Sequence, residues 1–181
     1  EVFYPSKWLN AVLVQCSEEE IAAVESLSIV ESVEFAAQGT ELPEGGRIAK
    51  FKDTESVNET LALNDFQLEL HGIPELHSEG YLGEGMLVAI LDGGFSGADT
   101  IQAFRHVFDE NRVLLAENIV SQNTDLYTSS HGTSVFSIMA AQLPDEYTGI
   151  IPEASFMLLV TEDVRSEQRI EEYNWIVGAE K

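Results

Sequence analysis

The chain has 181 residues, 44% of them hydrophobic, which is enough to bury the core of one full domain and a smaller unit. Its 32 acidic and 9 basic residues give a formal net charge of -23, which would repel nucleic acid and anionic membrane surfaces and argues against both as partners. No apolar run approaches the roughly 20 residues needed to span a membrane, and a single cysteine, Cys16, excludes an internal disulfide.

The first 36 residues predict a small β-α-β unit. Leu9 to Val14 is an apolar, strand-like run, and Ser17 with Glu20 forms a capping box that begins a helix. Residues 29–35 return to strand-like side chains. Residues 37–60 then mix Pro, paired Gly and charged residues, which is typical of a linker, with a short strand expected over 47–51.

From residue 61 onward, predicted strands and helices alternate. Residues 64–70 and 74–77 predict short helices, and Met86 to Leu91 is an unbroken apolar run of the kind found in a parallel strand buried on both faces. A helical segment is expected over 100–108. Further strands are expected over 113–120, beside the Asp92 strand, and over 155–161. A helix over 167–180, capped by Ser166, follows, so the pattern predicts a parallel α/β sheet with flanking helices.

Two polar motifs stand at the ends of these elements. Asp92 follows the apolar run directly and is itself followed by Gly93-Gly94, which places a carboxylate at the carboxyl end of a strand. His131 comes 131 − 92 = 39 residues later, just before a predicted helix over 132–141 whose apolar positions are Val135, Ile138 and Met139. The two motifs therefore offer one carboxylate and one imidazole.

Four segments, taken in order, resemble the subtilase family of subtilisin-like serine proteases. They are Gly80 to Gly85, Val88 to Gly94, Ser130 to Val135 and Gly149 to Ala154, the last with Ile150-Ile151 where a smaller pair is expected. The resemblance implies hydrolysis of peptide bonds in peptide or protein substrates by an Asp-His-Ser triad, with Asp92 and His131 as catalytic residues. It implies no cofactor and a location outside the cytoplasm.

The resemblance also divides the chain. Residues 1–36 resemble part of an inhibitor-like propeptide that assists folding and then occupies the substrate cleft; 37–60 form the linker; 61–181 resemble the N-terminal part of the catalytic domain. The first half of the propeptide and the part of the catalytic domain that carries the serine are expected to be absent. The parallel sheet is therefore expected to be incomplete and to bind the missing C-terminal half or to self-associate.

No residue of this chain takes the role of the nucleophile. Ser134 is excluded because it lies one turn along the same helix as His131, whereas the family's serine comes from a separate helix. Asn174 matches no oxyanion position of the family and is expected at the surface or in a groove. The chain alone should be inactive.

Two other interpretations remain open. The chain could be a non-catalytic binding or inhibitory module on a subtilase scaffold, which a Gly-Thr-Ser motif further along the parent polypeptide would exclude. It could also be a metal-dependent hydrolase that uses Asp92 and His131 as ligands, although two ligands are too few for a typical catalytic zinc site. His71 and His77 are expected at the surface, not as ligands.

Overall fold

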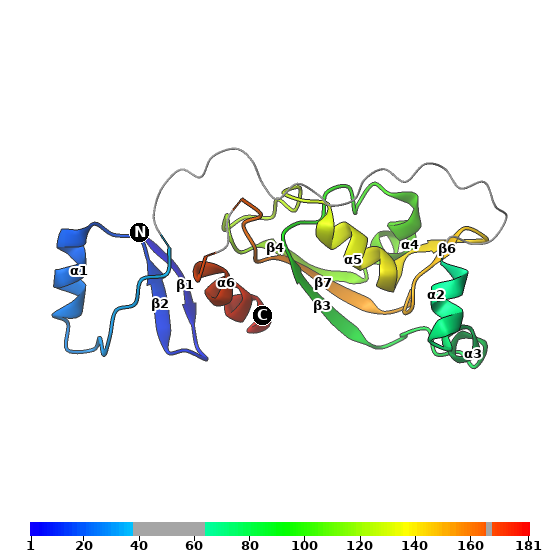
Figure 1. The fold of residues 1–181 in the computed structure, drawn as a ribbon, viewed down its shortest axis with the longest axis horizontal. Coiled ribbons are helices and arrows are strands. Elements are labelled where there is room, and N and C mark those ends of the chain that lie inside the picture. Colours follow the sequence, from blue (N-terminus) through cyan, green and yellow to red (C-terminus); the bar gives the residue numbers. More distant parts are fainter. Residues whose placement is uncertain (38–63, 166–167) are drawn as a thin grey trace.

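The computed structural model describes residues 1–37, 64–165 and 168–181 (Figure 1). Its centre is a parallel three-stranded sheet of β3 (Leu87–Asp92), β7 (Ser155–Val160) and β4 (Val113–Asn118), in the order β3-β7-β4. The predicted parallel α/β sheet is therefore confirmed. The prediction that the strand over 113–120 lies beside the Asp92 strand is wrong, because β7 crosses over and inserts between the two.

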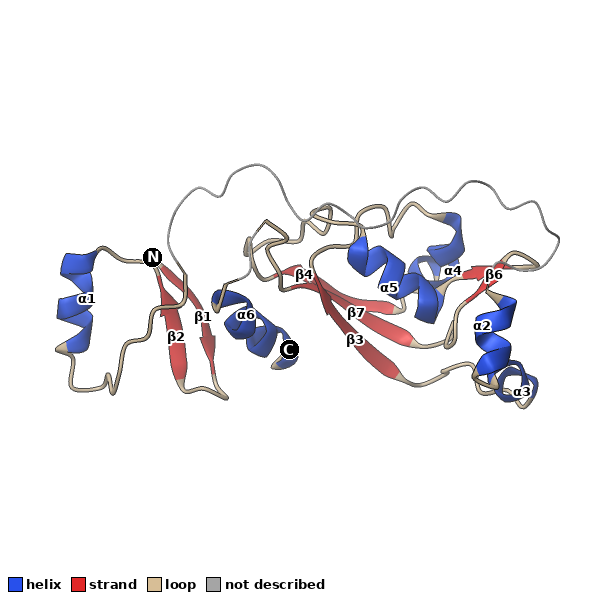
Figure 2. Cartoon of the chain, viewed as in Figure 1, coloured by secondary structure: helices blue, strands red, loops and turns tan. Residues whose placement is uncertain are grey.

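One face of the sheet is covered by α5 (His131–Ala140) and by α4 (Arg105–Asp109) with the 3-10 turn η1 (Gln102–Phe104) before it (Figure 2). Phe136 of α5 is fully buried there, stacked on Phe104 at 4.5 Å between ring centroids and edge-on to Phe156 at 5.0 Å. Such aromatic pairs add about 0.5–1.5 kcal/mol each beyond the area they bury. Ile138, predicted as an apolar position of this helix, is 52% exposed; Phe136 and Ala140 carry the packing instead.

The other face carries α6 (Ile170–Ala179), which approaches the sheet closely at Gly178. A Cβ on Gly178 would lie 3.0 Å from both Leu91 Cδ2 and Thr161 Cγ2. Leu87, on this face of β3, is 53% exposed, so the prediction that this strand is buried on both faces is wrong. In the strand order of the described sheet, β3 is an edge strand. Asn174 of α6, which was expected at the surface or in a groove, is buried. The expected cap Ser166 lies outside the described residues, and Arg169 is the N-cap.

Small elements stand at the opposite end of the sheet from the carboxyl end of β3. Helices α2 (Asp65–Leu70) and α3 (Ile73–Ser78) confirm the two predicted short helices, and β5 (Gln142–Leu143) pairs with β6 (Tyr147–Thr148). His77 is half-buried, with Nε2 2.8 Å from the Ile150 carbonyl, while His71 is exposed. In the described ranges no helix is both long enough and apolar enough to cross a bilayer.

The N-terminal unit is a hairpin followed by a helix. β1 (Val2–Ser6) pairs antiparallel with β2 (Ala11–Val14), and α1 (Glu18–Glu25) begins with the predicted capping box, in which Ser17 and Glu20 each bond the other's backbone N–H. Residues 29–35 form no strand, so the predicted β-α-β unit is wrong and the order is β-β-α. Their side chains are typical of a strand, but β-propensity depends on context and does not by itself make a strand.

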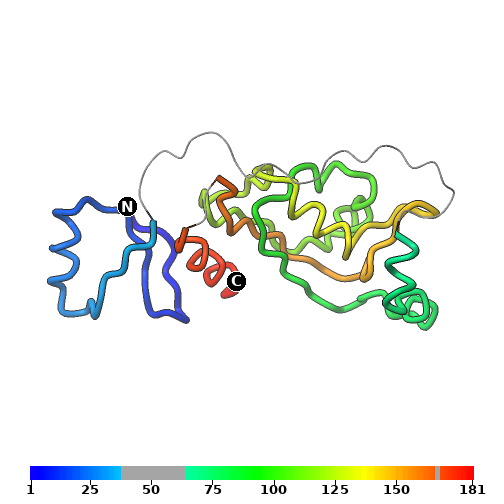
Figure 3. Tube along the Cα trace, viewed as in Figure 1, coloured from blue at the N-terminus to red at the C-terminus, as the bar shows by residue number. Residues whose placement is uncertain are grey.

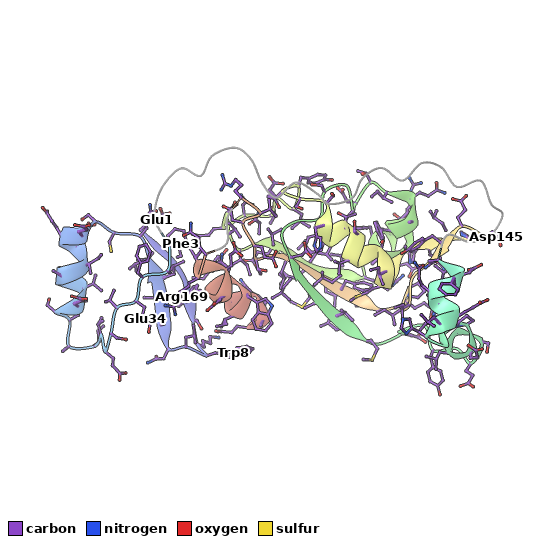
Figure 4. All side chains as sticks on the ribbon, in the orientation of Figure 1. Glu1, Phe3, Trp8, Glu34, Asp145 and Arg169 are labelled. Carbon is purple, nitrogen blue, oxygen red and sulfur yellow. The ribbon has the colours of Figure 1, made fainter. Side chains whose placement is uncertain are left out.

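The hairpin lies against the C-terminal helix (Figure 3). Tyr173 of α6 donates its hydroxyl to the Tyr4 carbonyl and accepts a bond from Leu13 N at 3.2 Å. At the start of the same helix, Arg169 Nη2 lies 3.1 Å from Glu34 Oε2 (Figure 4). None of the α1 residues is buried, so these contacts with α6, and not a core of its own, hold the N-terminal unit in place.

Candidate active site

Asp92 ends β3 at the carboxyl edge of the sheet. Its backbone carbonyl accepts a bond from Thr161 N at 3.0 Å, which ties it to the end of β7. Its side chain is only 8% exposed, and Oδ1 accepts a bond from Gly93 N at 2.7 Å. The carboxylate is therefore desolvated and fixed, with Oδ2 left for one further partner.

That partner is His131, the first residue of α5. His131 Nδ1 lies 2.8 Å from Asp92 Oδ2. Because an ionised carboxylate can only accept, Nδ1 carries the hydrogen of the neutral imidazole and Nε2 keeps its lone pair. The imidazole is 62% exposed. One side of the ring is thus anchored on a buried acid, while the ring remains open to an approaching hydroxyl or peptide, which is the arrangement a general base needs.

Glycines allow this close approach. A Cβ on Gly132 would lie 2.5 Å from the Gly94 carbonyl oxygen and 3.0 Å from Asp92 Cβ, so a side chain there would push α5 away from the strand. Gly94 has a φ of 150°, and a Cβ on it would collide with the backbone of Ser129. Gly94 and Gly132 are therefore both required, because a side chain at either position would not fit between the loop after Asp92 and the start of α5.

Hydrogen bonds join the loop after Asp92 to the segment before His131. Thr128 Oγ1 donates to the Gly93 carbonyl at 2.7 Å, and Ser96 N donates to the Ser129 carbonyl at 2.8 Å. Thr133 Oγ1, from the first turn of α5, donates to the Ser96 carbonyl at 3.0 Å. These bonds hold both ends of the Asp92–His131 pair in one rigid unit, so the pair is oriented before any substrate arrives.

Two other residues considered from the sequence lie away from the imidazole. Ser134 is exposed, and its hydroxyl donates to the Ser130 carbonyl at 3.3 Å. Among the residues that the structure describes, no serine hydroxyl bonds the His131 ring. Asn174 belongs to α6, which packs on Leu91, whereas α5 packs on the face that carries Ile90; neighbouring strand residues point to opposite faces. Asn174 is therefore on the far side of the sheet.

Sequence reasoning missed the neighbours of Gly93. A Cβ placed on Gly93 would collide with Val164 and would lie 3.9 Å from Glu162 Oε2. Glu162 directly follows the predicted strand over 155–161, and Val164 comes two residues later. The carboxyl ends of parallel strands meet at one edge of the sheet. A position just after the predicted strand over 155–161 was therefore the feature of the sequence that could have placed these residues near Asp92.

Charges at this edge are partly paired. Arg165 binds Asp163 through two contacts, Nε to Oδ1 at 2.8 Å and Nη2 to Oδ2 at 2.6 Å, and this hydrogen bonding lowers the pKa of Asp163. On the other side of the site, Tyr127 donates to Asp99, and this bond raises the pKa of Tyr127. Within residues 1–37, 64–165 and 168–181, no three His, Cys, Asp or Glu side chains converge as metal ligands would.

Comparison with known proteins places the N-terminal part. Residues 1–55 match the family model described as peptidase S8 propeptide domain, Bacteroidota. This part of the chain is thus similar to a subtilase propeptide, as its resemblance predicted. The match continues past the predicted boundary at 36 into the predicted linker, most of which lies outside the described residues. No curated protein matches the chain.

Proposed function

We propose that residues 61–181 are the N-terminal part of a subtilisin-like serine endopeptidase, in which Asp92 and His131 are two members of the catalytic triad. The observation that carries the proposal is the 2.8 Å contact from His131 Nδ1 to a buried Asp92 carboxylate, with the imidazole itself open to solvent. The similarity of residues 1–55 to a peptidase S8 propeptide supports the same family from an independent part of the chain.

In this mechanism His131 transfers the proton and Asp92 orients the imidazole. His131 Nε2 takes the proton of the serine hydroxyl as that oxygen attacks the peptide carbonyl, and then returns it to the leaving amine. Asp92 accepts the Nδ1 hydrogen bond, which selects the tautomer with a free Nε2 and stabilises the imidazolium that forms. The serine is proposed to come from another segment of the natural polypeptide. Residues 1–181 then supply the base and the residue that orients it, and have no covalent catalysis alone.

The N-terminal unit is proposed to act as a propeptide that docks on α6. Glu180, at the end of α6, accepts bonds from Ser6 Oγ at 2.5 Å, Lys7 N at 2.8 Å and Trp8 N at 3.2 Å. Tyr4 adds a bond to Glu117 of β4 at 3.1 Å. These polar contacts reach from the hairpin to both the helix and the sheet, as expected of a segment that assists folding of the domain on which it docks. A protease with such a propeptide is expected outside the cytoplasm.

The test uses the natural polypeptide that contains residues 1–181, studied by intact mass and fluorophosphonate labelling. We expect the probe to label one serine, and we expect this labelling to be lost in His131→Ala. In Asp92→Asn, kcat should fall by about 10⁴. A second fragment that co-purifies and takes the label would mean that this chain works as half of a cleaved protease. A polypeptide that folds but takes no label would overturn the proposal and leave a non-catalytic binding or inhibitory module.

A further inference from the structure

Glu162 lies at the same edge of the sheet as the Asp92–His131 pair. In the parallel pairing of β3 with β7, Asp92 is opposite Val160, and the next residue, Thr161, donates its N–H to the Asp92 carbonyl at 3.0 Å. Glu162 follows immediately. The chain therefore leaves the central strand beside Asp92, and Glu162 is one of the first residues past the strand end.

The glutamate side chain turns toward the site. A Cβ on Gly93 would lie 3.9 Å from Glu162 Oε2 and 3.8 Å from Ser129 Cβ. Gly93 bonds the Asp92 carboxylate through its N–H, and Ser129 Oγ accepts the His131 backbone N–H at 3.2 Å. The Glu162 carboxylate therefore lies beside Gly93, the residue whose N–H binds the Asp92 carboxylate, at the edge of the sheet that carries the pair.

The Glu162 charge is left uncompensated. The side chain is half-exposed, and no hydrogen bond or ion pair reaches its carboxylate from the described part of the chain. Arg165, three residues further on, is held by both oxygens of Asp163 and is not available to it. A free carboxylate beside a peptide-binding site attracts a cationic side chain, because charge-assisted hydrogen bonds are about twice as strong as neutral ones.

We infer that Glu162 is a specificity-determining residue, whose carboxylate binds a lysine or arginine side chain of the substrate at a position flanking the cleaved bond. The inference rests on the proposed function. The substrate class is therefore basic peptides, which the net charge of -23 would also concentrate near the protein. Asp99 and Asp125, in contrast, are both bonded to Tyr127.

The test compares matched peptides cleaved by the natural polypeptide. Lysine, glutamine and glutamate are placed in turn at each position flanking the cleaved bond, and kcat/KM is measured for each peptide. We expect lysine to be preferred over glutamine by about tenfold at one position. In Glu162→Gln that ratio falls to near one, and in Glu162→Lys the glutamate peptide becomes the preferred one. The matched control is Glu146→Gln, an exposed glutamate in the turn between β5 and β6, which should leave the ratio unchanged.

The possible failures are distinguishable. If the enzyme takes the fluorophosphonate label and cleaves peptides, but shows no charge preference or one that survives Glu162→Gln, the role of Glu162 is refuted while the proposed function stands. If no peptide is cleaved and no serine is labelled, the proposed function itself fails, and this inference with it.

Discussion

Gly132 gives the sharpest test of how the Asp92–His131 pair is held. In Gly132→Ala the new methyl group would lie 2.5 Å from the Gly94 carbonyl oxygen, and restoring an ordinary 3.4 Å contact requires a movement of about 0.9 Å. Because the Gly94 carbonyl oxygen is a backbone atom, it cannot turn aside as a side chain would, and the start of α5 must move instead. The same movement would lengthen the 2.8 Å bond from His131 Nδ1 to Asp92, to at most about 3.7 Å, which is beyond hydrogen-bond range.

The effect of Gly132→Ala on the free energy of unfolding follows from two opposing contributions. Overpacking a tight contact costs about 1–3 kcal/mol, while replacing glycine by alanine in a helix gains up to about 1 kcal/mol. We expect a net loss of about 1–2 kcal/mol in the free energy of unfolding, measured by urea titration, together with faster hydrogen exchange at His131 Nδ1 in NMR spectra. Ser134→Ala, on the same helix, is the control and should change neither. Unchanged stability and unchanged exchange in Gly132→Ala would refute the close-approach argument.

The remaining predictions concern the core and two titrating groups. Phe136→Ala should lower the free energy of unfolding by about 3–5 kcal/mol, since the ring is fully buried between two others, and Phe136→Leu by less than about 1.5 kcal/mol; equal losses in urea titrations would contradict this. The bond from Ser6 holds the pKa of Glu180 below its ordinary 4.5, so docking of the hairpin should persist above pH 4.5 and weaken as the pH falls below it. Hydrogen exchange of the hairpin amides measures this, and Glu180→Gln should abolish the dependence. Burial lowers the pKa of His106 below 6.5, so stability should be highest above pH 6.5 and decline below it; thermal unfolding of His106→Gln lacking that decline is the expected result.

Much of the candidate site was predictable because it depends on local chemistry. Asp92 ends an apolar run and His131 begins a helix, and both positions follow from the order of residues alone. The capping box of Ser17 and Glu20 was predictable for the same reason: its bonds join residues three apart. A resemblance between motifs then related two residues 39 positions apart, which no local rule could bring together.

What could not be predicted depends on partners distant in the chain. The apolar run of β7 gives no sign that it will lie between β3 and β4, because strand order is decided by how the crossovers pack. Residues 29–35 carry side chains typical of a strand but form none, because β-propensity is decided by the surrounding contacts and not by the side chains alone. Glu162 shows no motif at all; its place beside Gly93 follows from the sheet register.

The link between Ser6 and Glu180 has a consequence for the order of folding. These residues are 174 positions apart, so the hairpin, which is synthesised before α6, can make this docking contact only after residue 180 has left the ribosome. The Glu180 carboxylate, just past the end of α6, can accept the N–H groups of Lys7 and Trp8 only after α6 has formed. Complete docking of the hairpin therefore depends on both β4 and α6, two elements that are synthesised well after it.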